Sequence, residues 1–292
     1  MNDAATLRAR LRARLAEDRP LVLPGAGDPL GARLIQQAGF EAAYMSGYAV
    51  EGTHGMPDVG LLGMSEVVAR AAAMTAVLDI PLVCDADTGY GEIVNVIRTV
   101  REFERAGVCA IQLEDQGFPK KCGSMAGRKL ISKEAMCAKI RAAVDTRRDR
   151  NFMIIGRTDA FAVEGRDQAL ERLHAYAEAG ADLSMVLGPY KVEDVAFFGE
   201  RVTRPLAYLN SESFTMPMIP VPELHRMGIR IAIFPLALLF SATRAMQRTL
   251  AQIREHGTTQ AVFDETMVSW DAFNALTGFD AIRAAEDRYA AR

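Results

Sequence analysis

The chain alternates between short apolar segments and amphipathic helical segments, and this alternation constrains its fold more than any other feature. Four helical segments end in a residue pair with glycine second, and an apolar segment soon follows each pair: Ala38-Gly39, Ala106-Gly107, Ala179-Gly180 and Met227-Gly228. Glycine at a helix end supplies the left-handed cap that redirects the chain toward the next strand. The recurrence therefore indicates a weak internal repeat of strand-helix units.

Eight segments are expected to form strands, namely residues 21–25, 42–46, 82–84, 110–113, 153–156, 183–187, 206–209 and 229–234. Helices are expected between them, two of them over residues 93–105 and 166–178, and residues 47–63 are expected to form a long loop. Strands that alternate with helices pair in parallel, so eight units predict a closed (β/α)8 barrel of the TIM type. A doubly wound open sheet is the alternative, but no GxGxxG motif follows the first strand.

The barrel is expected to span residues 1–255, including an arginine-rich N-terminal helix over residues 2–19. Residues 256–292 are expected to form a helical extension with an apolar stripe of Phe263, Met267, Trp270 and Phe273. A complete barrel offers this stripe no obvious place. The extension is therefore predicted to pack on a neighbouring subunit.

Half of the 292 residues are apolar, which is enough to bury a large core. The net charge of -3 gives no basic surface for nucleic acid or for anionic membranes. No apolar run approaches the roughly 18 residues of a membrane span, and the first residues lack the apolar core of a signal peptide. The sequence thus predicts a soluble cytoplasmic protein with no nucleic-acid or membrane partner.

Carboxylates follow two neighbouring strands, with Asp85 and Asp87 after the third and Glu114 at the end of the fourth. Asp58 in the long second loop could add another. Each residue alone could cap a helix or face solvent, but in a parallel barrel the strand ends gather at one face. Carboxylate oxygens suit Mg²⁺ or Mn²⁺, so this set predicts a metal site.

A cationic loop with one thiol, Lys120-Lys121-Cys122-Gly123, follows the second group of acids. Positive charge near a thiol lowers its pKa, so Cys122 is a candidate acid/base group. Arg157 follows the fifth strand. It could pair with Asp159, or its planar guanidinium could bind a substrate carboxylate.

Seven segments together resemble the isocitrate lyase and phosphoenolpyruvate mutase superfamily: Tyr44–Gly47, Gly55–Gly60, Cys84–Gly91, Leu113–Gln116, Lys120–Gly123, Gly156–Ala160 and Ala162–Gly165. The resemblance covers most of residues 20–255. The lysine, cysteine and glycine loop is typical of the lyase branch, and the overall pattern is most similar to the 2-methylisocitrate lyases.

This resemblance implies a Mg²⁺-dependent barrel that exchanges its last helix between subunits, giving a homotetramer built from two dimers. It also implies cleavage of a 2-hydroxy acid to a 2-oxo acid and a second carboxylic acid. Tyr44 would accept the hydroxyl proton, and Cys122 would protonate the carbanion. Substrate contacts would come from Ser46, Gly47, Tyr48, Lys121, Gly123, Ser124, Arg157, Asn210 and Arg244.

Several positions depart from the lyase pattern. Ser124 stands where the lyases usually have histidine, and the region of Leu187 stands where the methylisocitrate lyases have glutamate. The spacing from Asn210 to Phe214 also differs, and Trp270 replaces an arginine of the tail. These positions would contact the second product, so the substrate is expected to be a smaller or more apolar substituted malate.

Other activities of the superfamily stay open. Phosphonate mutases and decarboxylases generally lack the loop cysteine, so Cys122 counts against them, whereas an oxaloacetate hydrolase retains it. A non-catalytic barrel is the remaining alternative, but the presence of Asp85 and Cys122 counts against it. The loop over residues 120–128 is expected to close over bound substrate and exclude water.

Overall fold

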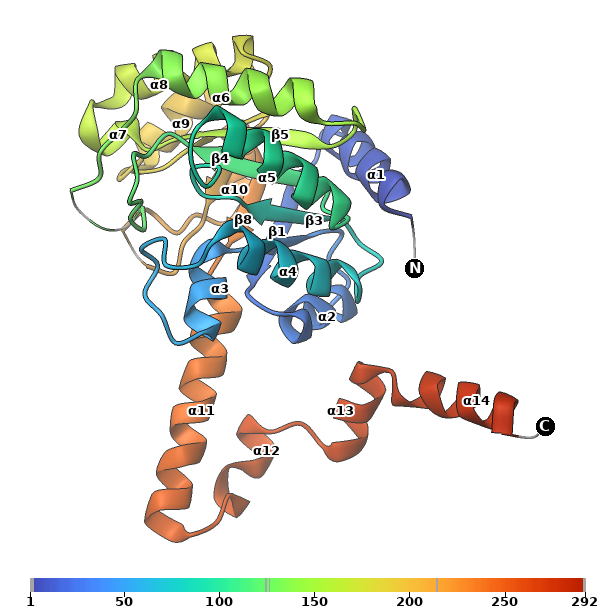
Figure 1. Ribbon diagram of the computed structural model, residues 1–292. Coiled ribbons are helices and arrows are strands. Elements are labelled where there is room, and N and C mark those ends of the chain that lie inside the picture. Colours follow the sequence, from blue (N-terminus) through green and yellow to red (C-terminus); the bar gives the residue numbers. More distant parts are fainter. Residues whose placement is uncertain (1–2, 124, 126, 214, 291–292) are drawn as a thin grey trace. The chain divides into compact units, whose positions relative to one another are not determined.

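The computed structural model describes residues 3–123, 125, 127–213 and 215–290, in which eight parallel strands close into a barrel in sequence order (Figure 1). The strands are β1 (Leu21–Ala26), β2 (Ala43–Met45), β3 (Leu82–Asp85), β4 (Ala110–Glu114), β5 (Met153–Thr158), β6 (Leu183–Val186), β7 (Leu206–Leu209) and β8 (Ile229–Phe234). Pairing of β1 with β8 closes the sheet, so the predicted barrel is confirmed and the open sheet is excluded.

Helices connect the strands, and those between β2 and β6 are seen outside the barrel in Figure 1. They are α2 (Pro29–Gln37), α3 (Gly47–Thr53), α4 (Met64–Thr75), α5 (Ile93–Arg105), α6 (Lys133–Thr146), α7 (Ala160–Val163), α8 (Arg166–Glu178), α9 (Val192–Arg201) and α10 (Val221–Arg226), and α11 (Ala237–His256) follows β8. The inner faces of these helices and both faces of the strands supply one continuous apolar core. Such burial on both faces is usual for a parallel sheet.

The expected loop over residues 47–63 contains helix α3, which the sequence analysis missed. Ser46 caps this helix by accepting a hydrogen bond from the amide of Ala49 at 3.3 Å. The buried carboxylate of Glu51 then accepts the amides of Val59 and Leu61, at 3.0 and 3.1 Å. The helix and its acidic side chain therefore hold the loop that carries Asp58.

Helix α1 (Ala4–Ala16) covers the amino-terminal end of the barrel, opposite the carboxyl ends of the strands. Arg8 donates to the carbonyl of Val108 just before β4, at 2.9 Å. Arg14 donates to the carbonyl of Pro20 just before β1, at 2.7 Å. This end of the barrel is thereby closed by arginine contacts with backbone, which leaves the opposite end for a functional site.

The chain divides into two compact units, residues 1–238 and residues 239–292. The second unit contains most of α11, a 3₁₀ helix η1 (Gln260–Val262), α12 (Phe263–Thr266), α13 (Trp270–Thr277) and α14 (Phe279–Ala290). The predicted helical extension is therefore present. The division falls at the start of α11, whereas the sequence analysis placed the boundary after this helix.

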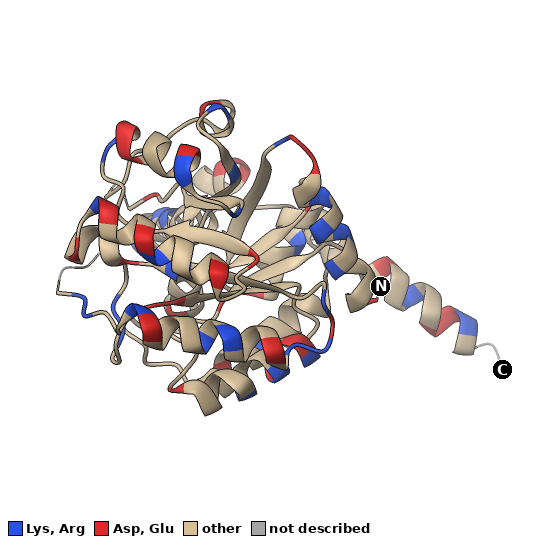
Figure 2. Cartoon of the chain, turned by 90° about the horizontal axis from the view of Figure 1, so that it is seen from above, with Lys and Arg blue, Asp and Glu red and all other residues tan. Residues whose placement is uncertain are grey.

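Acidic and basic residues are interspersed along the outer helices of the barrel (Figure 2). This mixture agrees with the nearly balanced composition, which has 34 basic and 37 acidic residues. Among the described residues, no helix combines the length and apolar character needed to cross a membrane.

Candidate active site

The register of the barrel brings the predicted site residues of three neighbouring strands together. Asp85, the last residue of β3, pairs with Gln112 of β4. Glu114, the last residue of β4, pairs with Arg157 of β5. The carboxylates that the sequence placed at separate strand ends thus lie side by side at the carboxyl end of the barrel, where barrel enzymes bind their substrates.

Asp87 lies in a strained turn directly after β3. Its φ of 48° is in the left-handed region, which non-glycine residues rarely adopt. The turn is held because the Asp87 amide donates to Asp85 Oδ1 at 3.0 Å and its carbonyl accepts the Glu114 amide at 2.9 Å. At Gly47, a Cβ atom would lie 3.1 Å from Asp85 Oδ2 and 3.4 Å from Asp87 Oδ1. Gly47 therefore leaves room for this pair of carboxylates.

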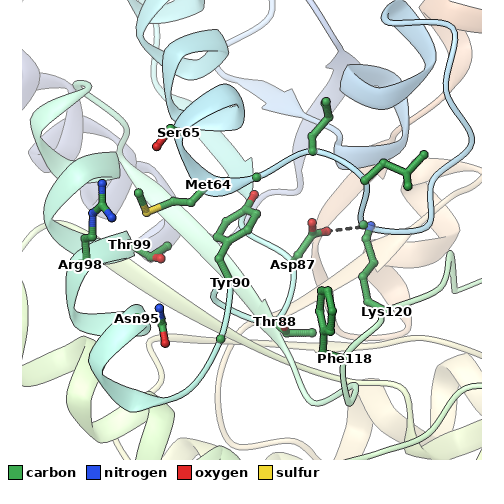
Figure 3. Close-up of a pocket in the computed structure, with 15 residues that line it drawn as sticks. Met64, Ser65, Asp87, Thr88, Tyr90, Asn95, Arg98, Thr99, Phe118 and Lys120 are labelled. Atoms are coloured by element: carbon green, nitrogen blue, oxygen red, sulfur yellow. Dashed lines mark ion pairs between the residues drawn. The ribbon is translucent and has the colours of Figure 1, made fainter.

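Lys120 supplies a cation inside the carboxylate cluster, which the sequence analysis did not foresee. Its side chain is only 5% exposed, and its Nζ forms ion pairs with the carboxylate of Asp58 and with Asp87 Oδ1, the latter at 2.8 Å. Figure 3 shows Lys120 and Asp87 facing each other in the wall of a pocket. Asp58, predicted as a metal ligand, thus joins the cluster through the loop that carries Cys122.

The crowding of buried carboxylates changes their titration. Burial raises the pKa of Asp85 to about 6, with a further contribution from Asp87. Burial likewise holds the pKa of Glu114 well above its usual value, although Arg157 opposes this. Burial alone would lower the pKa of Lys120, but Asp87 and then Asp58 outweigh it and hold that pKa well above its usual value. Burial therefore favours the protonated form of Asp85 and of Glu114, while Lys120 stays protonated.

Tyr44 is buried on β2 and reaches the cluster through Gln112. Its hydroxyl donates to Gln112 Oε1 at 2.9 Å, and Gln112 Nε2 donates to Asp85 Oδ1 at 3.0 Å. Burial, followed by the charge of Asp85, raises the pKa of Tyr44 well above its usual value. The phenol therefore keeps its proton in the metal-free chain, and the role of Tyr44 as the base for the substrate hydroxyl stays a prediction.

Arg157 is shared between two carboxylates. Its NH1 lies 2.9 Å from Glu114 Oε2, and its Nε and NH2 donate to Asp159 at 2.8 and 3.2 Å. Both pairs are buried. The pairing with Asp159 that the sequence left open is present, and it fixes the plane of the guanidinium at the site.

The Cys122 loop is anchored in this site by backbone contacts. The amide of Cys122 donates to the carbonyl of Asp58 at 3.1 Å, and the Cys122 side chain is half-buried. At Gly123, a Cβ atom would lie 2.9 Å from Arg157 NH2 and 1.6 Å from Leu187 Cδ2. The loop backbone therefore packs directly against the guanidinium and against a buried leucine, which only glycine allows.

The other predicted substrate contacts have different surroundings. Ser46 is buried as the cap of α3, and Tyr48 lies half-buried in the first turn of that helix. Lys121 is exposed, with its Nζ beside Gly127. These side chains stay predictions as substrate contacts.

Asn210 uses both groups of its amide on one backbone segment. Its Nδ2 donates to the carbonyl of Ile219 at 2.8 Å, and its Oδ1 accepts the amide of the same residue at 2.9 Å. Asn210 therefore shapes the segment after β7, and its contact with substrate stays a prediction. Ser124 lies outside the described residues, and Arg244 belongs to the second compact unit, so both stay predictions.

A second buried network, which was not predicted from the sequence, is centred on Asp115 and supports the site. Asp115 accepts hydrogen bonds from Thr158 Oγ1 at 2.6 Å, from the Asp159 amide at 2.9 Å and from the Tyr176 hydroxyl at 2.7 Å. Arg172 NH1 adds a longer contact at 3.3 Å. The two adjacent carboxylates therefore have different roles. Glu114 faces the site, whereas Asp115 fixes β5 and Asp159.

The carboxylate cluster fits a hard divalent cation. Asp87 Oδ1 and Glu114 Oε1 are buried without a hydrogen-bond partner among the described residues, so both oxygens are available to a cation or its waters. No three His, Cys, Asp or Glu side chains of the described chain are arranged as a ready set of direct ligands. Mg²⁺ typically keeps several of its waters in proteins, so carboxylates at this wider spacing suit a hydrated ion.

Comparison with known proteins places the site in a family context. A profile of the phosphoenolpyruvate phosphomutase family matches residues 11–254. A 2,3-dimethylmalate lyase of Eubacterium barkeri is 46% identical over 283 residues, which covers 97% of this chain and 98% of that protein. A 2-methylisocitrate lyase of Aeropyrum pernix is 44% identical over 263 residues, covering 90% and 85%.

Solved structures agree with this relationship. An oxaloacetate acetylhydrolase in complex with the inhibitor 3,3-difluorooxalacetate superimposes with a TM-score of 0.94 at 31% identity, covering 99% of both chains. A phosphonopyruvate hydrolase in complex with oxalate and Mg²⁺ has a TM-score of 0.89 at 30% identity, covering 99% of this chain and 100% of that one. The chain is therefore an enzyme of the phosphoenolpyruvate phosphomutase family, within the phosphoenolpyruvate mutase/isocitrate lyase superfamily.

Proposed function

We propose that this enzyme is a Mg²⁺-dependent carbon-carbon lyase that cleaves a 2-hydroxy di- or tricarboxylate to a 2-oxo acid and a second carboxylic acid. The observation that carries the proposal is the hydrogen bond from the Cys122 amide to the Asp58 carbonyl at 3.1 Å. This bond ties a loop thiol to the carboxylate cluster. A proton donor beside a cation site and an arginine is the set of groups that carbanion chemistry requires.

The bond changes are those of a retro-aldol reaction. The substrate hydroxyl loses its proton to water, its carbon becomes the carbonyl of the 2-oxo acid, and the bond to the neighbouring carbon breaks. The electron pair of that bond stays on the departing carbon, next to its own carboxylate. Cys122 then donates a proton to this carbon, so that the second product leaves as a carboxylic acid.

The binding roles follow from charge and position. Asp58, Asp85, Asp87 and Glu114 would hold Mg²⁺, or Mn²⁺ in its place, and the bound ion would stabilise negative charge on the oxygen of the forming carbonyl. Arg157, fixed in plane by Glu114 and Asp159, would bind the carboxylate of the 2-oxo acid portion. Support for the metal also comes from the Mg²⁺ complex of the related phosphonopyruvate hydrolase.

We further propose an alkyl-substituted malate as substrate, in preference to 2-methylisocitrate. Leu187 is buried and packs against Gly123 next to Arg157, so an apolar branched side chain lies beside the guanidinium. Such a surface favours an alkyl substituent over a third carboxylate, because a buried carboxylate there would lack a partner. The similarity to a 2,3-dimethylmalate lyase supports the same substrate class.

Hydrolysis of oxaloacetate is the second candidate, because an oxaloacetate acetylhydrolase superimposes closely on this chain. Oxaloacetate decarboxylation and phosphonate rearrangement are less favoured, because the residue pattern that includes Cys122 resembles the lyase branch. A substrate panel separates these possibilities.

The proposed assembly is a homotetramer in which the C-terminal extension packs on a neighbouring subunit, and the proposed compartment is the cytoplasm. No residue of α11 is buried, and its apolar residue Leu250 is 65% exposed. Trp270 on α13 is 81% exposed. Apolar side chains left in water along a whole segment support a partner surface.

The test is release of 2-oxo acid from a panel of 2,3-dimethylmalate, other alkylmalates, 2-methylisocitrate and isocitrate, with and without Mg²⁺. Consumption of oxaloacetate, with release of oxalate and acetate, is measured beside it. We expect an alkylmalate to be the best substrate and release to require Mg²⁺. Cys122→Ser is the matched control, because it replaces the thiol with a much weaker acid of similar size. Turnover of oxaloacetate alone would contradict the lyase proposal, and efficient cleavage of 2-methylisocitrate would contradict the substrate preference.

A further inference from the structure

The ammonium of Lys120 lies within the carboxylate cluster and compensates part of its negative charge. Its Nζ contacts the carboxylates of Asp58 and Asp87, two of the four proposed metal ligands. The contact with Asp87 Oδ1 measures 2.8 Å but lacks hydrogen-bond geometry, so that oxygen remains without a hydrogen bond among the described residues. The ammonium therefore neutralises charge in the cluster without fully satisfying its oxygens.

The same lysine belongs to the loop that carries the proposed proton donor. Asp58 holds this loop twice, through its side chain to Lys120 and through its carbonyl to the Cys122 amide. Lys120 is thus one of two ties between the Cys122 loop and the segment after α3. Cys122 lies two residues after Lys120. A change in the cation that Asp58 and Asp87 bind should therefore change the position of Cys122.

Lys120 also has space into which it can move. Figure 3 shows it in the wall of a pocket of 640 Å³ that is further lined by Tyr90, Met64, Phe118 and residues of α5. A pocket of this size accommodates a displaced lysine side chain together with water. The ammonium can therefore leave the carboxylates without being forced into packed protein.

We propose that Lys120 is the internal cation of the metal-free enzyme, that Mg²⁺ displaces its ammonium from Asp58 and Asp87, and that this exchange couples metal binding to the position of the Cys122 loop. The inference rests on the proposed metal site and adds a positioning residue to it. The electrostatic reason is direct: the ammonium and the ion would compete for the same oxygens at close range, where charges of like sign repel strongly.

The test is titration of metal-free protein with Mg²⁺ in a calorimeter. The proteins compared are the wild type, Lys120→Met and the matched control Lys121→Met. Both variants remove one positive charge from the same loop, and Lys120 is the lysine whose Nζ forms ion pairs with Asp58 and Asp87. We expect Lys120→Met to bind Mg²⁺ at least about tenfold more tightly than the wild type, and Lys121→Met to change the affinity by less than about threefold.

A second readout follows the loop without using activity. Hydrogen exchange at the Cys122 amide should accelerate when Mg²⁺ is added to the wild type, because one tie to Asp58 is lost. In Lys120→Met the exchange should already be fast, and Mg²⁺ should change it little. If Lys120→Met is unstable without metal, Lys120→Arg keeps the charge, and its Mg²⁺ affinity should stay within about threefold of the wild type.

The outcomes separate this inference from the proposed function. Equal Mg²⁺ affinity in Lys120→Met and Lys121→Met, or weaker binding in Lys120→Met, would overturn the role of Lys120 while leaving the metal site in place. Absence of Mg²⁺ binding in the wild type and in every variant would overturn both. Binding that appears only in Lys120→Met would support the displacement strongly.

Discussion

At the scale of single residues, two cations make a buried cluster of carboxylates possible. Lys120 pairs with Asp58 and Asp87, and Arg157 pairs with Glu114. No cation among the described residues forms an ion pair with Asp85, which is held by the side-chain amide of Gln112 and by backbone. It is the carboxylate whose charge is compensated least directly, so its titration reports on the state of the site.

Asp85 should make the metal-free protein less stable as the pH rises. Its pKa is raised from the ordinary 3.8 to about 6 in the folded state, so the folded protein holds this proton more tightly than the unfolded chain. The resulting stabilisation is fully present below the unfolded value and is lost as the pH rises through about 6. Between about pH 4 and about pH 7, the free energy of unfolding of the wild type should fall relative to Asp85→Asn by on the order of 1–2 kcal/mol.

Denaturant unfolding in a chelating buffer, with both proteins measured at each pH, checks this expectation. Added Mg²⁺ should cancel the loss in the wild type at the upper end of the range. A constant difference between the two proteins across the range would mean that Asp85 titrates normally.

Replacement of Tyr44 by phenylalanine tests whether its hydroxyl orients Asp85 or transfers a proton. Because the phenol stays protonated and donates to Gln112, Tyr44→Phe removes one neutral hydrogen bond from the chain that holds Asp85. Such a loss is worth about 1 kcal/mol, so kcat should fall by about tenfold or less. Steady-state kinetics with the best substrate gives the number, and a fall of about a thousandfold would support the role of Tyr44 as a base.

At the scale of elements, β4, β5 and α8 are joined by one buried carboxylate. Asp115 on the loop after β4 accepts from Thr158 of β5, from the Asp159 amide and from Tyr176 of α8. Through Asp159 the same network orients Arg157. The rear of the site is therefore built by contacts between elements that are far apart in sequence.

Removing this carboxylate should destabilise the barrel and disturb the site together. Asp115→Ala leaves several buried donors without an acceptor, so it should lower the free energy of unfolding by about 3 kcal/mol or more. Tyr176→Phe removes only one of the bonds to Asp115, together with the bond that the Tyr176 hydroxyl accepts from Arg172 at 3.2 Å, and should cost about 1–2 kcal/mol. Equal losses in the two variants, measured by denaturant unfolding, would show that the network is not organised around Asp115.

The sequence predicted the elements whose signals are local. Helices over residues 93–105 and 166–178 have the predicted bounds, because a full amphipathic period ends in each at a helix-capping glycine. Helix α3 was missed because it is short and contains two glycines, and its following loop is fixed by long-range bonds from Glu51. Local pattern carries no information about such bonds.

The residues of the candidate site also differ in whether the sequence could predict their positions. Asp85, Asp87 and Glu114 could be predicted because parallel strands must end at one face of the barrel. The positions of Lys120 and Gln112 could not, since they depend on the register of β3 with β4 and on the path of a loop. A buried glutamine in an otherwise apolar strand was the signal that could have identified Gln112.

At the scale of the whole molecule, the chain is a barrel unit with a well-filled core and a helical unit with few buried side chains. The exposed apolar side chains of the second unit include Leu250, Ile253, Trp270 and Phe273. A segment this rich in exposed apolar surface is expected to be covered in solution by another copy of the chain.

A charge on that surface should weaken the assembly. Leu250→Glu places a carboxylate on an apolar surface of α11, so the protein should shift from tetramer to smaller species. Gln247→Glu adds the same charge to an exposed polar position of the same helix and should leave the mass unchanged. Light scattering after size-exclusion chromatography measures both, and an unchanged mass for Leu250→Glu would exclude this surface from the interface.

The central claim is that the site breaks a carbon-carbon bond and that Cys122 protonates the carbon left behind. Cleavage of 2,3-dimethylmalate in D₂O, followed by NMR, tests it most directly. The account predicts pyruvate and propionate in equal amounts, with one deuterium on the methylene carbon of propionate, and predicts that Cys122→Ser loses most of the rate. Undiminished cleavage by Cys122→Ser, or no cleavage of any substituted malate by the wild type with Mg²⁺, would contradict the account.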